Sequence, residues 1–316
     1  MNRSFAALAL LLCVASSAEA QPSPVAPFPR GLSGTLAFQS DVRTATNPNG
    51  RTKIYTIDLE TGRVVSLTPS GNWNDEQPRW SPDGGRIAFK SDRSGSYNLY
   101  VMNADGSNVV RLTEHGAVDH DPTWLPDGES LVFTSDRDRG AGRWDLYRIW
   151  IGDRSVERLT NFFQGYAFMP SVSPDGNWVA FVASTFPFDG GHANQVHVLE
   201  LATRMTWPFD MTAPGCWPSW SPDGASIAHV HLLNEPSTIQ IVSSFGDAPE
   251  PIVGDPSRWH YYPDWSPDGR RLAIAVSPQH HHDEDWDLAI VDRSREMPIQ
   301  RLTTGAGNDR LPDWKP

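Results

Sequence analysis

Histidine and carboxylate side chains crowd one short stretch near the end of the chain, in the run Gln-His-His-His-Asp-Glu-Asp over residues 279–285. Neutral imidazole and carboxylate groups are suitable ligands for zinc, manganese or nickel. The candidate metal ligands are His120, His260, His280 and His282. Adjacent side chains of an extended loop point in alternating directions, so a solvated loop is the simpler interpretation. We therefore predict no cofactor, with a divalent first-row metal as the alternative.

A second set of residues lies just before six prolines that recur along the chain, acidic in the first half and aromatic in the second. Convergent carboxylates bind cations or basic groups, and aromatic faces bind sugar rings or apolar side chains. The candidate binding residues are Glu76, Asp119, His120, Asp121, Phe168, Trp217, His260, Tyr261, Tyr262 and Arg310. Asp41, Asp92 and Asp136 add Ser-Asp pairs in the first half only. The alternative is that these side chains simply pack, since scattered aromatics on loops need no special cause.

Motifs of the common catalytic families are missing. The chain has no Gly-any-Ser-any-Gly, His-Glu-any-any-His or Cys-any-any-Cys motif and no phosphate-binding Gly loop. Cys216 is interpreted as a small packing residue rather than a nucleophile. A formal net charge of −12 without clustered Lys or Arg argues against a nucleic-acid partner. We expect a binding module, with a metal-assisted carbohydrate lyase or hydrolase at the same place as the alternative.

The elements that would position these residues are set by a repeat of Pro-any-Trp-Ser-Pro-Asp-Gly. Its clear, loose or shortened copies begin at Pro78, Pro122, Pro170, Pro218, Pro263 and Pro312. Successive copies are 44 to 49 residues apart, which is the length of a four-stranded propeller blade. Apolar strands such as Ile87-Ala88-Phe89 follow the Asp-Gly turns, where Gly tolerates the positive φ of a hairpin.

The two ends of the chain complete one repeat between them. The pattern is entered at residues 34–38 without a first strand, and it ends at Trp314 without a second strand. We therefore predict an all-β, six-bladed propeller of four-stranded antiparallel blades, closed by the strand around Trp314 pairing beside the strand at Leu36. Loops before the innermost strands then share one face, which gathers the candidate binding residues at the mouth of the central channel.

The repeat also resembles a known family. Trp80-Ser81-Pro82-Asp83-Gly84, followed by Ile-Ala-Phe, Ser-Asp and Leu112-Thr113, is similar to the TolB-type propeller repeat. The resemblance implies a partner that is a protein or a cell-envelope component. It does not include the N-terminal α/β domain of full TolB proteins, so a Tol-system role is not carried over. Oligogalacturonate lyases, which resemble these propellers and use a His-rich manganese site, motivate the enzymatic alternative.

Residues 1–20 have the features of a secretory signal peptide cleaved after Ala20. Arg3 precedes the apolar run of residues 5–14, and Ala18-Glu19-Ala20 supplies the small residues of a cleavage site. The apolar run is shorter than the ~20 residues that span a bilayer. No second long apolar segment follows, so we expect no membrane insertion after cleavage.

We expect residues 21–32 to form a Pro-rich linker and residues 33–316 to form the propeller. Cys216 is the one cysteine after the signal peptide, so no internal disulfide is expected. The predicted location is the periplasm or the medium outside the cell.

Overall fold

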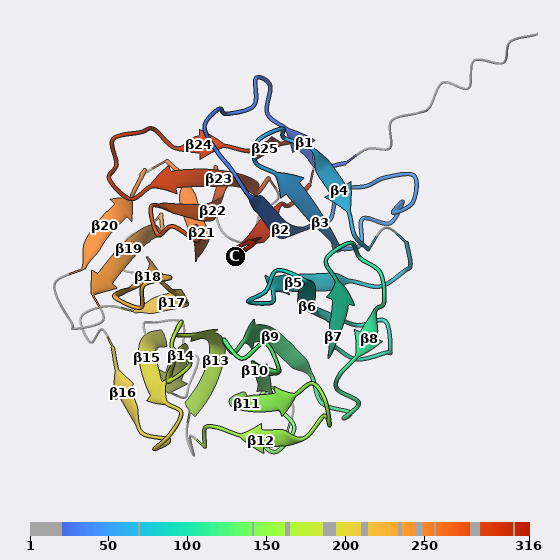
Figure 1. Cartoon of the computed structure of the whole chain (residues 1–316), viewed down its shortest axis with the longest axis vertical. Helices are drawn as coiled ribbons and strands as arrows, with labels where there is room; N and C mark the ends of the chain where they lie inside the picture. The colour runs from blue at the N-terminus through green and yellow to red at the C-terminus, as the bar shows by residue number, and fades with distance from the viewer. Residues whose placement is uncertain are drawn as a thin grey trace, which may run out of the picture.

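The structure, a computed structural model, describes residues 21–316 apart from residues 69, 141, 162–164, 186–193, 210–213, 233–235, 244–248, 256, 279–284 and 306. The predicted signal peptide lies outside the described residues. Every regular element within them is a β-strand, and six four-stranded antiparallel sheets form a ring around a central channel (Figure 1). The predicted six-bladed propeller is confirmed. The described residues include no helix with the length and hydropathy needed to cross a membrane.

Each blade runs from an innermost strand at the channel to an outermost strand at the rim (Figure 1). Blade 1 consists of β26 (Arg310–Trp314), β2 (Thr35–Ser40), β3 (Lys53–Asp58) and β4 (Val64–Ser66). Blade 2 consists of β5 (Asp75–Trp80), β6 (Arg86–Ser91), β7 (Asn98–Asn103) and β8 (Val110–Arg111). Blade 3 consists of β9 (Asp119–Trp124), β10 (Ser130–Ser135), β11 (Asp145–Trp150) and β12 (Val156–Arg158).

The second half of the ring repeats this order. Blade 4 consists of β13 (Gly165–Val172), β14 (Trp178–Thr185), β15 (Asn194–Glu200) and β16 (Thr206–Pro208). Blade 5 consists of β17 (Gly215–Trp220), β18 (Ser226–His231), β19 (Thr238–Ser243) and β20 (Glu250–Val253). Blade 6 consists of β21 (Trp259–Trp265), β22 (Arg271–Ser277), β23 (Asp287–Asp292) and β24 (Gln300–Arg301).

The ring closes where the two ends of the chain meet. Strand β26 pairs antiparallel with β2, and Trp314 lies opposite Leu36, as predicted. Both side chains are buried in one apolar cluster that also includes Ile290 of blade 6. Closure removes two sheet edges that would otherwise expose unpaired backbone groups. The five residues of β26 therefore supply the innermost strand that completes blade 1.

The motif tryptophans join neighbouring blades. Trp124 of blade 3 is buried in a cluster with Leu99 of blade 2, and its indole N–H donates to the carbonyl of Arg79 over 2.9 Å. Trp265 of blade 6 donates in the same way to the carbonyl of Ser219 in blade 5, over 3.0 Å. Each ring thus buries a large apolar area between two blades and satisfies its polar atom there.

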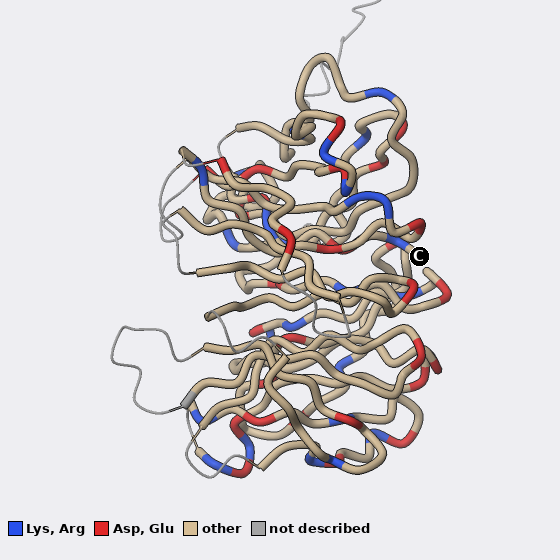
Figure 2. Tube along the Cα trace, turned by 90° about the vertical axis from the view of Figure 1, so that its left-hand side faces the viewer, with Lys and Arg blue, Asp and Glu red and all other residues tan. Residues whose placement is uncertain are grey.

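The Pro-Asp-Gly turns lie at the opposite end of the innermost strands from the mouth. In the first of them, the Ser81 hydroxyl and the Gly85 N–H donate to the Asp83 carboxylate over 2.5 and 3.0 Å. Gly84 has a φ of 63°, which Gly adopts without a side-chain clash. We call this side of the molecule the turn face. Acidic residues recur along it, on the side where the C-terminus lies (Figure 2).

The Pro-rich stretch of residues 21–32 adds a finding to the predicted linker. Its strand β1 (Ser23–Pro24) pairs antiparallel with β25 (Thr303–Thr304), which follows β24 in the chain, and the two strands form a small sheet of their own. Leu32 is buried, and Phe28 packs against the cluster between blades 6 and 1. These contacts arise because apolar residues alternate with the prolines of the stretch. The segment therefore forms part of the packed domain rather than a free connection.

Candidate binding site at the channel mouth

A backbone irregularity shapes the mouth six times. In each innermost strand the residue before proline has a φ between 52° and 58°, an uncommon value for residues other than Gly. We call these the bulge residues: Gln77, Asp121, Met169, Trp217, Tyr262 and Leu311. The strand register shifts at each of them. Such a bulge leaves one residue outside the ladder and redirects its side chain.

The polar bulge residues satisfy one another across the blades. The Gln77 N–H donates to the Gln39 side chain over 2.9 Å, and the Asp121 N–H donates to the Gln77 side chain over 2.7 Å. The Met169 N–H continues the series by donating to the Asp121 carboxylate over 3.2 Å. An innermost strand has no neighbour on its channel side, so its N–H groups need such acceptors. Asp121, predicted as a binding residue, therefore also supports the ring.

Beside Asp121, the polar half of the mouth has accessible side chains. Glu76 forms an ion pair with Lys90 at 2.9 Å and accepts a hydrogen bond from the Tyr97 hydroxyl at 3.0 Å. The His120 ring packs edge-on against Trp144, with ring centroids 4.3 Å apart, and its Nδ1 lies 2.8 Å from Asp121. Burial raises the pKa of Asp121, but the charge and hydrogen bond of His120 outweigh burial and hold the pKa at about 2.

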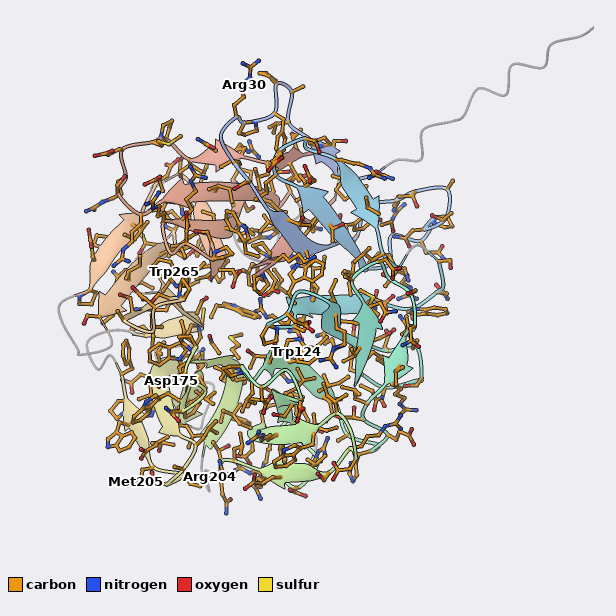
Figure 3. The ribbon with its side chains drawn as sticks, viewed as in Figure 1. Arg30, Trp124, Asp175, Arg204, Met205 and Trp265 are labelled. Atoms are coloured by element: carbon orange, nitrogen blue, oxygen red, sulfur yellow. The ribbon has the colours of Figure 1, made fainter. Side chains whose placement is uncertain are left out.

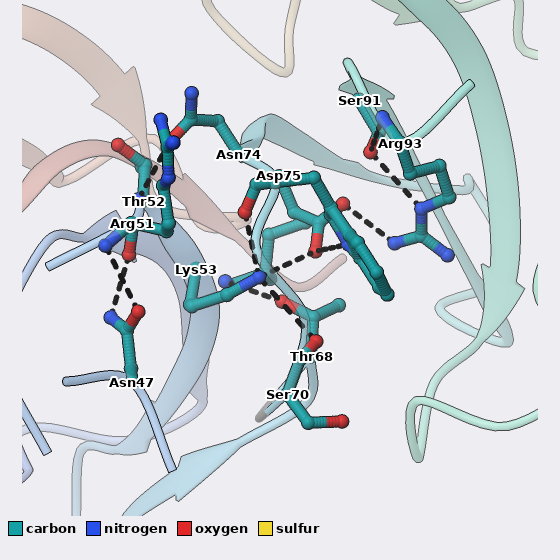
Figure 4. A network of polar contacts seen from close by, with 12 residues as sticks. Asn47, Arg51, Thr52, Lys53, Thr68, Ser70, Asn74, Asp75, Ser91 and Arg93 are labelled. Atoms are coloured by element: carbon teal, nitrogen blue, oxygen red, sulfur yellow. Dashed lines mark hydrogen bonds and ion pairs between the residues drawn. The ribbon is translucent and has the colours of Figure 1, made fainter. Parts of the chain in front are cut away.

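Asp119 lies beneath the mouth rather than in it. Its carboxylate is buried and accepts a bond from Arg137 at 2.9 Å. Asp75, in the same place one blade earlier, pairs with Arg93 at 2.6 Å and with the buried Lys53 at 3.7 Å (Figure 4). Buried carboxylates need such partners because an unpaired charge is costly away from water. The structure thus gives Asp119 a role between strands, in contact with Arg137.

The Ser-Asp pairs of the first three blades also hold the fold. Asp92 accepts a hydrogen bond from the Asn74 N–H at 2.7 Å, and Asp41 accepts one from the Asn308 N–H at 2.7 Å. Asp136 accepts one from the Val118 N–H at 2.9 Å. Each aspartate therefore fastens the loop that leads into the innermost strand of its own blade.

The aromatic half of the mouth is a single cluster. Trp217 and Tyr262 meet edge-to-face, with ring centroids 4.7 Å apart, and Tyr262 lies 6.2 Å from Trp286. Tyr261 is buried against Trp286, at 5.6 Å, and Phe168 packs on the same cluster. Trp217, Tyr262 and Phe168 are only partly buried. Bulky rings with accessible surface at a channel opening are suited to hold apolar groups.

Arg310 lies at the border of the two halves. Burial raises the pKa of the Tyr262 hydroxyl, and the guanidinium of Arg310 partly offsets that effect. The tyrosine is therefore a neutral hydrogen-bonding group at neutral pH. Arg310 is the one candidate that offers a positive charge beside the aromatic rings.

His260 does not face the mouth. Its side chain is buried, its Nδ1 lies 3.3 Å from the Ser237 carbonyl, and burial lowers its pKa, which keeps the ring neutral. No group of three or more His, Cys, Asp or Glu among the described residues is placed to hold a metal. His280 and His282 lie outside the described residues. The absence of a cofactor stays a prediction, with a metal at this face as its alternative.

Sequence reasoning missed a charged group deeper in the channel. A cavity of about 70 Å³ is lined by Trp217 and Tyr262 and, further in, by Arg79, Asp264 and Asp313. Arg79 pairs with Asp313 at 3.1 Å. The three residues occupy the middle position of Pro-any-Trp, which was treated as variable. Comparing that position across the repeats would have shown two aspartates and one arginine among small polar residues.

The two channel aspartates cap strand edges as the bulge residues do. Asp313 accepts the Trp80 N–H at 2.5 Å, and Asp264 accepts the Trp314 N–H at 2.7 Å. Burial, with the nearby charge of Asp313, raises the pKa of Asp264 to about 8. Burial raises the pKa of Asp313 as well, so one arginine serves two carboxyl groups that both hold a proton more readily than a free aspartate.

Cys216 lies next to Trp217 but points into the cluster. It is buried, and burial raises the pKa of its thiol, so the thiolate needed for nucleophilic attack does not form at neutral pH. The interpretation of Cys216 as a packing residue agrees with its place in the apolar cluster.

With the fold and mouth established, known proteins supply the family. The model of the TolB β-propeller domain matches residues 40–205, more than half of the chain. The chain belongs to the TolB β-propeller family. A TolB homolog of Chlorobium luteolum is 35% identical over 169 residues, which cover 54% of this chain and 36% of the homolog. The chain thus spans only part of that TolB relative.

Solved TolB structures share the architecture. TolB from Acinetobacter baumannii superposes with a TM-score of 0.72 at 22% identity, over 92% of this chain and 68% of that one. A putative TolB from Agrobacterium tumefaciens superposes with a TM-score of 0.66 at 15% identity, over 90% of this chain and 100% of that one. At these identities the likeness establishes the TolB propeller fold alone.

Proposed function

We propose that this TolB-type propeller is a non-catalytic binding module that holds a protein segment of a cell-envelope partner at its channel mouth. The observation that carries the proposal is the Trp217–Tyr262 pair, partly accessible and lining the channel cavity. An apolar side chain of the partner would pack against these rings, and polar groups of the same segment would face Glu76 and His120. A few buried aromatic side chains commonly provide most of the binding free energy of such an interface.

The proposal includes export. The pattern of residues 1–20 and the TolB family both favour a periplasmic location, with secretion from the cell as the alternative. The mature protein would then begin at Gln21. N-terminal sequencing of the protein recovered from a periplasmic fraction checks this start, and recovery of the uncleaved chain from the cytoplasm would contradict it.

The test of binding uses this mature protein as bait. We expect wild type to retain a partner from periplasmic extract that the double variant Trp217→Ala, Tyr262→Ala releases, because the anchor pair is removed. Loss of one anchor commonly weakens binding by about tenfold or more. The matched control is Trp150→Ala, a partly buried Trp on β11 that takes no part in the mouth. Equal capture by all three proteins, or by none, would refute the proposal.

A further inference from the structure

A groove between blades 4 and 5 opens on the turn face. It has a volume of about 510 Å³, and its walls include Trp178, Trp207 and Trp220. The rings of Trp178 and Trp207 lie 5.7 Å apart at 52°. Two carboxylates, those of Asp175 and Asp223, complete the lining, and no Lys or Arg is among the described residues that line it. The groove is therefore aromatic and negatively charged.

The same place between blades 2 and 3 is filled by the chain itself. There Arg86 stacks on the motif Trp124, with its guanidinium carbon 4.9 Å from the ring centroid. It also donates to the carbonyl of Gly128, in the Pro-Asp-Gly turn of blade 3, over 2.6 Å. Between blades 4 and 5 the corresponding tryptophan is Trp220 and the corresponding glycine is Gly224. Both line the open groove.

Trp178 stands where the arginine would be. The backbone N–H of Arg86 donates to the hydroxyl of Ser81, the serine of the turn motif, over 2.9 Å. The backbone N–H of Trp178 donates in the same way to the Ser173 hydroxyl over 3.0 Å. The two residues therefore hold the same position in their blades. Replacement of Arg by Trp at this position leaves Trp220 without the cation that covers Trp124.

Two further motif tryptophans carry a cation of the same chain. Lys315 lies over Trp80 at 5.0 Å, and Arg293 lies over Trp265 at 5.4 Å. Three of the five motif tryptophans thus carry a cation of the same chain, whereas no Lys or Arg that the structure describes lies in this way over Trp220 or over Trp314. Trp314 is buried, and of these two tryptophans Trp220 is the one that lines the open groove. A cation placed on an aromatic face is stabilised by the ring, more so when it is removed from water.

We propose that this groove binds an arginine side chain of a partner protein segment. The guanidinium would stack on the tryptophan rings and donate to the Gly224 carbonyl, as Arg86 does to Gly128. Its charge would face Asp175 and Asp223. The Ser221 hydroxyl donates to Asp223 over 2.5 Å, which lowers the pKa of Asp223 and keeps it ionised. Arginine fits better than lysine because the planar guanidinium both stacks and donates several bonds.

The groove is separate from the channel mouth. The Pro-Asp-Gly turns and the mouth lie at opposite ends of innermost strands of six to eight residues, roughly 20 Å apart. Asp223 also borders a neighbouring groove that contains Arg293, and it is the one residue that the two linings share. The inference does not depend on the function proposed for the mouth.

The decisive variant is Trp178→Arg, which gives blade 4 the arginine that blade 2 already has. We expect the new side chain to cover Trp220 and fill the groove, as Arg86 covers Trp124. The probe is a fluorescein-labelled peptide with three arginines separated by Gly and Ser, and fluorescence anisotropy at about 0.15 M salt limits long-range attraction. We expect wild type to bind it saturably and Trp178→Arg to bind at least about tenfold more weakly.

Two comparisons separate the filling of the groove by the new side chain from the effect of its positive charge. Met205→Arg adds the same charge at an exposed site outside the groove, on the rim of blade 4 and further from the channel than Asp175 (Figure 3). We expect this control to stay within about twofold of wild type. A peptide with citrulline in place of arginine has nearly the same shape without the charge, and we expect about tenfold weaker binding.

Equal weakening by Trp178→Arg and Met205→Arg, or equal affinity for the citrulline peptide, would overturn the proposal. Thermal melting followed by circular dichroism establishes that each variant is folded. If Trp178→Arg does not fold, Trp207→Ser provides the same test, because Trp207 is 37% exposed and its loss leaves the core intact. Unchanged binding by Trp207→Ser would then count against the groove.

Discussion

At the scale of single residues, the middle position of Pro-any-Trp determines the electrostatics of the channel. Arg79 pairs with Asp313, whose pKa burial nevertheless raises, and Asp264 is left with a backbone N–H as its hydrogen-bond donor among the described residues. Burial and the charge of Asp313 raise the pKa of Asp264 to about 8. The folded protein therefore binds a proton at Asp264 that the unfolded chain releases near pH 4.

This proton links stability to pH. Because the folded pKa lies above the unfolded value, the stabilisation from the bound proton is present in acid and is lost as pH rises through 8. We expect Asp264→Asn, which still accepts the Trp314 N–H, to reduce the fall in free energy of unfolding between pH 5 and pH 8. The reduction is at most about 1.4 kcal/mol per pH unit. Urea unfolding at both pH values measures it.

Asp268→Asn is the matched control for this prediction. The Ser266 hydroxyl donates to Asp268 and lowers its pKa, so this turn carboxylate is ionised at both pH values. The variant should lose stability equally at pH 5 and pH 8. A wild-type slope that is unchanged in Asp264→Asn would show that Asp264 does not carry the proton.

At the scale of elements, the innermost strands are held on their channel side by side chains rather than by another strand. Gln39, Gln77 and Asp121 accept N–H groups of the next blade, and Asp264 and Asp313 do the same lower in the channel. The sequence indicated each strand through its Pro-any-Trp motif. It did not indicate the left-handed φ before each proline, which at Gln77, Asp121 and Met169 accompanies a hydrogen bond to an acceptor of the neighbouring blade.

The closing strand β26 is the element on which ring closure depends. Trp314 is buried between blades 6 and 1, so Trp314→Ala should cost about 3 to 5 kcal/mol of the free energy of unfolding. The matched change Trp207→Ala, at an exposed position on β16, should cost about 1 kcal/mol or less. Chemical unfolding of the two variants compares them. Similar losses from both would mean that the closing strand does not anchor the ring.

At the scale of the whole molecule, repeat spacing predicted the fold because each blade is one unit of nearly constant length. The site was harder to predict. Trp217 and Tyr262 were identified where the repeats differ, and they do meet at the channel. Asp119 and His260 were also identified there, but both side chains are buried. Neither spacing nor residue type reveals which side of a bulged strand a side chain takes, since that depends on packing between blades.

At each end of the channel axis, equivalent positions of the six blades carry different kinds of residue. Around the mouth, polar bulge residues in blades 2 and 3 give way to aromatic ones in blades 5 and 6. On the turn face, Arg86 of blade 2 covers the motif tryptophan of blade 3, whereas the equivalent residue of blade 4, beside the motif tryptophan of blade 5, is Trp178. Six nearly equal blades supply a stable frame, and the departures from equality give the molecule its two candidate sites.

Photo-cross-linking in the cell tests the central claim about the mouth most directly. A benzoylphenylalanine at Phe168 lies on the aromatic half of the mouth, and one at Val156, which is 40% exposed on β12, lies on the outer rim. After irradiation we expect a discrete protein adduct from the Phe168 position and none from the Val156 position. No adduct from the mouth, or the same adduct from both positions, would contradict the account.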